Sequence, residues 1–147
     1  MGLVETVAPA VGVWVVVAPL CAPLLLAERV RVLFTWPTAS LSVNYLLVSC
    51  LVATGHYLTF LAATVAQGGH LDGHGILWTA GTVIVGYPLA LWAGASVGLP
   101  ALGRWEPAGE GVDGRLILAV GAVGYVVAVG IAFAFLFTVA VFAAFPG

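Results

Sequence analysis

The sequence contains no lysine, and its 147 residues include only four arginines and six acidic residues. Charged residues make up 7% of the chain, whereas a soluble domain carries about 25%. This shortage excludes an ordinary soluble domain, and without a basic cluster nothing points to nucleic-acid binding. The only two cysteines, Cys21 and Cys50, both lie in apolar stretches, which excludes a disulfide-rich secreted domain.

Apolar residues are abundant instead: 63% of the chain is hydrophobic and its mean hydropathy is +1.18. Four stretches are long and apolar enough to cross a hydrocarbon core of about 30 Å as helices. Helices are expected because a pair of short strands cannot satisfy its backbone in lipid. The expected fold is an all-α integral membrane protein, a single domain over residues 1–147 with four transmembrane helices in an up-down bundle. The predicted spans cover roughly residues 7–27, 40–66, 76–98 and 116–144.

The first apolar stretch is interpreted as a retained helix and not as a secretory signal. Residues 1–6 contain no basic residue and include Glu5, whereas a signal peptide begins with a positively charged region.

The basic residues predict how the chain is oriented in the cell membrane. Basic residues in short loops favour the cytoplasmic side. The first and third loops are therefore expected in the cytoplasm, and both termini and the second loop outside, an N-out/C-out topology. The residues behind this prediction are Arg29, Arg31, Arg104 and Arg115.

His56 is the most ionisable side chain within the predicted spans, which contain no Asp, Glu, Lys or Arg. An ionisable residue inside a membrane is a candidate functional residue. Ser49 and Thr59 lie on the same helical face as His56 because they are seven residues before it and three after it. Tyr87 is expected at a similar depth, about 15 Å from the outer surface. These four residues form a predicted mid-membrane polar site.

Two interior prolines are expected near the same depth. Pro19 and Pro88 each leave a carbonyl four residues earlier without its usual donor. Polar groups and helix kinks could therefore converge on a small hydrophilic site. The alternative is that His56 hydrogen-bonds Tyr87 or a freed carbonyl and only fixes the helix register. A b-type haem is disfavoured because the spans contain one histidine, whereas such a haem normally takes one from each of two helices.

Small residues follow one face of the third span at four-residue spacing. Such a face lets another backbone approach closely and predicts helix packing. The fourth span has glycines toward its inner end and an aromatic outer end that suits lipid or a partner subunit. The small face of the third span comprises Thr82, Gly86, Ala90, Gly94 and Gly98, and the aromatic end comprises Phe133, Phe135, Phe137, Phe142 and Phe145.

The second loop, "QGGHLDGHG", contains two of the three histidines. In an extended segment the side chains of His70, Asp72 and His74 project to one side, as in a two-histidine-one-carboxylate site for a divalent metal. No other cofactor is expected. The alternative is a flexible hinge in which Asp72 caps the following helix.

Three functions follow from these observations. The first is an accessory or structural subunit of a membrane complex, or a homo-oligomer, without catalytic activity of its own. Its partners would be the lipid bilayer and either other membrane subunits or further copies of the chain. The second is a small transporter or channel with its site at His56 and Tyr87. The third is an extracytoplasmic metal or redox site at His70, Asp72 and His74.

Overall fold

The computed structural model describes residues 3–69, 72–109 and 111–144, and no β-strand occurs among them. The predicted all-helical fold is therefore confirmed for this part of the chain. The elements in chain order are α1 (Leu3–Cys21), η1 (Ala22–Leu26), α2 (Glu28–Arg31), η2 (Val32–Phe34), α3 (Leu41–Ala66), α4 (Gly73–Ala93), η3 (Gly94–Gly98), α5 (Leu99–Ala101) and α6 (Gly114–Ala144).

Three helical segments are long and apolar enough to cross a membrane: α3, the continuous helix formed by α4, η3 and α5, and α6. No charged residue interrupts α3 or the helix over residues 73–101, and the one charged residue of α6, Arg115, lies at its start. η3 is a π-helical turn within the second of these segments. All three correspond to spans predicted from the sequence.

The first predicted span differs from its prediction because it is not a straight helix over residues 7–27. The α-helix ends at Cys21, continues as the tighter helix η1, and is followed by a bend of 120° into α2 and η2. Pro23 has no N–H to donate to the carbonyl of Pro19, which explains why the α-helical ladder ends here. Among the described residues, a fourth candidate span exists only if this bent pair counts as one.

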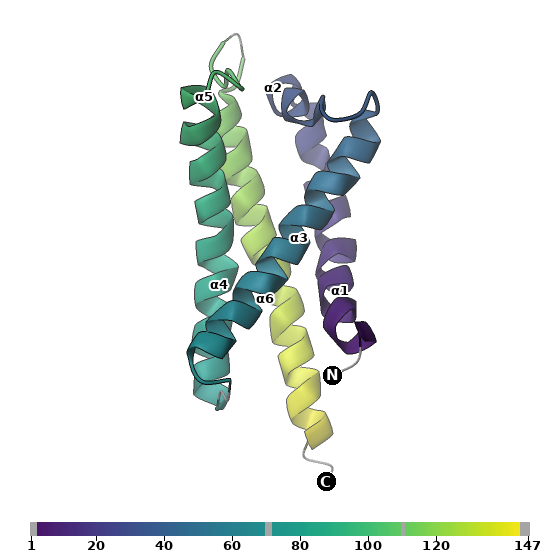
Figure 1. The fold of residues 1–147 in the computed structure, drawn as a ribbon, viewed down its shortest axis with the longest axis vertical. Helices are drawn as coiled ribbons and strands as arrows, with labels where there is room; N and C mark the ends of the chain where they lie inside the picture. The colour runs from purple at the N-terminus through teal and green to yellow at the C-terminus, as the bar shows by residue number, and fades with distance from the viewer. Residues whose placement is uncertain (1–2, 70–71, 110, 145–147) are drawn as a thin grey trace.

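α3 and α6 cross near the middle of the molecule, with α1 and α4 on either side (Figure 1). α1 packs against both α3 and α6, and α4 packs against the same two helices. The four helices therefore enclose a common interior. The start of α1 and the end of α6 lie at one end of the molecule, here called the terminal end (Figure 1). α2 and α5 lie at the other end, here called the arginine end because every arginine is in or next to the loops there.

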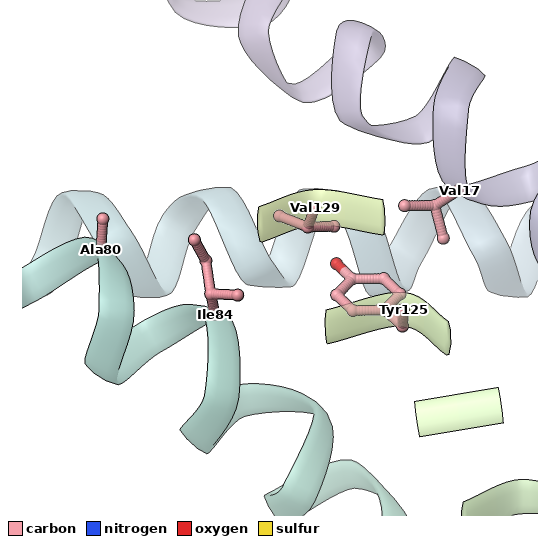
Figure 2. Packing of buried hydrophobic residues seen from close by; sticks show 5 residues of the cluster. All are labelled: Val17, Ala80, Ile84, Tyr125 and Val129. Atoms are coloured by element: carbon pink, nitrogen blue, oxygen red, sulfur yellow. The ribbon is translucent and has the colours of Figure 1, made fainter. Parts of the chain in front are cut away.

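The buried core is small and lies where α1, α4 and α6 approach one another. Val17, Ala80, Ile84, Tyr125 and Val129 form its centre (Figure 2). Most large apolar side chains point outward instead, and only 6% of the apolar window of α6 is buried. A protein in water rarely exposes so continuous an apolar surface.

The loops of the arginine end are fixed by two buried polar side chains. Asn44 has no exposed surface; its amide donates to the carbonyls of Phe34 and Thr38, both at 2.8 Å, and accepts from the Thr38 N–H at 2.9 Å. This network holds the first loop against the start of α3. Trp105 is 5% exposed, and its indole N–H donates to the carbonyl of Arg29 at 2.8 Å. The third loop is thereby joined to the first.

Candidate mid-membrane polar site

His56 on α3 meets Tyr125 on α6 where these two helices cross. The Tyr125 hydroxyl lies 3.0 Å from His56 Nδ1, and both side chains are buried, at 5% and 6% exposure respectively. When the imidazole carries its proton on Nε2, Nδ1 accepts a hydrogen bond from the hydroxyl. The pair therefore satisfies one ring nitrogen and a phenolic hydroxyl away from water.

Tyr87 on α4 completes the site. Its ring meets that of His56 edge to face, with centroids 5.2 Å apart and an interplanar angle of 67°. Its hydroxyl donates to the carbonyl of Val52 at 2.9 Å, and not to His56 or to the carbonyl of Ile84. Gly55 makes this approach possible, because a Cβ at that position would overlap the Tyr87 hydroxyl. Side chains from three helices thus form one polar layer, which we call the His56 layer: His56, Tyr87 and Tyr125.

Ser49 and Thr59 do not join this layer. Ser49 is buried, accepts a hydrogen bond from the indole N–H of Trp14 at 2.9 Å and donates to the carbonyl of Leu46 at 3.0 Å. Thr59 is exposed and its hydroxyl donates to the carbonyl of Gly55 at 2.7 Å. Of the four residues predicted for the site, the structure therefore brings together only His56 and Tyr87. Ser49 instead connects α3 to α1.

Tyr125 is not among the residues predicted for the site from the sequence. It is the only tyrosine of α6, and a buried tyrosine hydroxyl usually requires a hydrogen-bond partner. That rule, combined with its position well inside the helix, is the signal that could have identified it.

Two cavities lie on opposite sides of the His56 layer. Tyr125 lines one of about 360 Å³ toward the arginine end, here called the arginine-end cavity. His56 lines the other, of about 650 Å³, toward the terminal end. Apolar side chains form nearly all of both walls.

The small-residue face of the third span points away from the other helices. Thr82, Gly86, Ala90 and Gly94 are exposed, and Gly98 is half-buried. A Cβ built on Gly86, Gly94 or Gly98 meets no other described atom within 4 Å. Among the described residues, no helix of this chain covers this face.

The second loop is described only in part, because His70 lies outside the described residues. Asp72 caps α4: its carboxylate accepts from the N–H of Gly75 at 2.6 Å. His74 is exposed, and its ring lies edge-on to Trp78 with centroids 6.4 Å apart. Asp72 thus makes the contact expected of a helix cap. The metal-site hypothesis needs His70 and stays a prediction.

Comparison with known proteins assigns the chain to a family. Residues 1–147 match the model of a domain of unknown function, DUF8162, and the chain belongs to this family. No curated protein and no solved structure matched the chain.

Proposed function

We propose that this protein is a four-helix membrane bundle that works by association and has no catalytic activity of its own. It is either an accessory subunit of a larger membrane complex or a homo-oligomer. The observation that carries the proposal is the open small-residue face of α4. In lipid, helices associate through close packing because hydrocarbon surrounds them on every side. Gly86 and Gly94 have free space of at least 4 Å around a would-be Cβ, so a helix from another chain can approach closely.

The bilayer is the medium in which this bundle is proposed to fold. The outward side chains of its helices are apolar along their length; Leu51 on α3 and Phe142 on α6, for example, are 71% and 74% exposed. With α1 and its bent continuation counted as one span, four helices cross the membrane. The arginine end is then cytoplasmic, because basic residues in short loops are retained there. Reporter domains fused after Gly103 and after the end of α6 test this orientation, and the proposal requires a cytoplasmic signal from the first and an external signal from the second.

The association is tested by bulky substitutions on the open face. Gly86→Leu and Gly94→Leu place side chains where a partner helix would pack, but they meet nothing within this chain. Gly81→Leu is the matched control. Gly81 is also exposed on α4 with no neighbour within 4 Å, but it is not one of the small residues at four-residue spacing that form the open face. Light scattering of detergent-extracted particles should show a smaller mass for Gly86→Leu and Gly94→Leu only. An unchanged mass for all three variants would contradict the proposal.

A second candidate function is a small transporter or channel centred on the His56 layer. The observation in its favour is that the layer separates two cavities, as a central barrier in a pathway would. Because His56 is the most readily ionised side chain of the layer, a proton is the simplest substrate to test. Vesicles loaded with a pH-sensitive dye should lose proton flux with His56→Ala if this function is correct. Absence of flux through the wild-type protein would remove the candidate.

A further inference from the structure

The arginine-end cavity owes its shape to the helix crossing. α3 and α6 meet at the His56 layer and separate toward the arginine end (Figure 1). All four long helical segments contribute to its wall, including Val17, Val48, Leu91 and Ala122. Leu24 of η1 closes part of the space by packing so tightly on α6 that a Cβ at Gly121 would overlap it. The cavity is therefore a half-open pocket bounded by the four long helices and by residues of η1, α2 and η2.

The polar groups in its wall already have partners. The Tyr45 hydroxyl donates to the carbonyl of Ala18, and the Trp92 indole N–H donates to the carbonyl of Arg115 at 3.0 Å. Ser49 and Tyr125 are hydrogen-bonded as described above. These side chains therefore have little left to offer a polar ligand, and an occupant gains mainly from burying hydrocarbon.

We propose that the arginine-end cavity binds one acyl chain of an anionic phospholipid. Its volume of about 360 Å³ lies within the range of about 300–1,000 Å³ typical of ligand sites. An apolar cavity of less than half this size, about 150 Å³, stays dry and takes up apolar molecules. Charge supports the choice of lipid: the fully buried Val30 lines the cavity and lies between Arg29 and Arg31 in α2. Arg29 and Arg31 outnumber Glu28 in α2, and this local excess of positive charge attracts the phosphate of an anionic headgroup.

This inference goes beyond the proposed association. It requires the bundle to lie in a bilayer, but it requires no partner chain and uses the interior of the bundle, not the outward face of α4. Loss of association in Gly86→Leu with intact lipid binding, or the reverse, would therefore separate the two proposals.

The test uses the full-length protein in phosphatidylcholine vesicles containing a phosphatidylglycerol with a diazirine in one acyl chain. After irradiation, mass spectrometry locates the labelled residues. We expect labelling at Val48 and Ala122, which line the cavity, and we expect excess unlabelled phosphatidylglycerol to suppress it. Labelling at outward residues such as Val123, which is 63% exposed, should not saturate. Labelling restricted to outward residues would overturn the proposal.

Filling the cavity provides the second readout. In Ala122→Phe the added ring occupies part of the cavity. If it excludes about two methylenes of the lipid's acyl chain, affinity and therefore saturable labelling should fall about tenfold. Ala134→Phe is the control because Ala134 is exposed on the same helix and lines neither cavity. Ala95→Phe fills the cavity from η3 and replaces Ala122→Phe if that variant does not fold. Saturable labelling that is equal in the filled variant and the control would contradict a site in this cavity.

Discussion

The Tyr125 hydroxyl and His56 Nδ1 lie 3.0 Å apart and join residues 69 positions apart in the chain. Within the described residues, this is the side-chain hydrogen bond that connects α3 to α6. It lies at the crossing of these helices, with a cavity on either side. This polar contact therefore marks where the two helices approach each other, while α1 and α4, which each pack against both, hold them in place.

Removing this hydrogen bond should weaken the bundle. Tyr125→Phe leaves the ring in place but deprives His56 Nδ1 of its partner, and we expect a loss of about 1 kcal/mol in the free energy of unfolding. Titration with a denaturing detergent measures it. Tyr57→Phe is the control, because Tyr57 is half-buried and its hydroxyl makes no hydrogen bond to the described residues. Equal stability of the two variants would show that the contact does not contribute.

Gly55 should resist even the smallest side chain. Alanine usually stabilises a helix relative to glycine by about 1 kcal/mol, but at this position its Cβ would overlap the Tyr87 hydroxyl. Gly55→Ala should therefore lower the free energy of unfolding by about 1–3 kcal/mol. Gly130→Ala, with no neighbour within 4 Å, should not. Adding Tyr87→Phe should restore most of the loss in Gly55→Ala, and a failure to restore it would mean that the hydroxyl is not the obstacle.

Asn44 should hold the first loop in place. Asn44→Ala leaves the Thr38 N–H and the carbonyls of Phe34 and Thr38 without this partner. We expect a loss of about 2 kcal/mol, together with faster tryptic cleavage after Arg31, which is exposed in the same loop region. Ser42→Ala, an exposed position in the same helix, is the control. Unchanged cleavage in Asn44→Ala would contradict the role given to the network.

The cap and metal interpretations of Asp72 predict different results for two variants. A cap tolerates Asp72→Asn, because asparagine also accepts from the helix N-terminus, but Asp72→Ala should cost about 1 kcal/mol. A metal site would be weakened by both changes. Zinc titration of the purified protein, followed calorimetrically, separates the two roles. Binding of one equivalent that is lost in Asp72→Asn would favour the metal site.

The sequence predicted those features that depend on local composition. The extent of α3 follows from its apolar run and from Ser40, whose side chain accepts from the N–H of Val43 at the start of the helix. The proximity of His56 and Tyr87 followed from matching their depths along two helices. Depth is a good guide because the rise per residue of a helix is constant.

Features that depend on helix rotation and crossing were not predictable in this way. The depths of Ser49 and Thr59 in the membrane do not reveal their hydrogen bonds. Ser49 accepts from Trp14 on α1, whereas Thr59 donates to a carbonyl of its own helix. Tyr125 was missed because its hydroxyl implies a hydrogen-bond partner but does not reveal which helix supplies that partner. Similarly, the spacing of Gly86 and Gly94 predicts a packing face, but only the tertiary structure reveals that this chain leaves it open.

The most direct test of the proposed function is the mass and composition of the particle after gentle detergent extraction from native membranes, measured by native mass spectrometry. The proposal predicts that this chain occurs in a fixed ratio with other membrane subunits, or as a symmetric assembly of its own copies. A particle containing one copy of the chain alone would contradict association as its function, and the His56 layer would become the first site to test for transport.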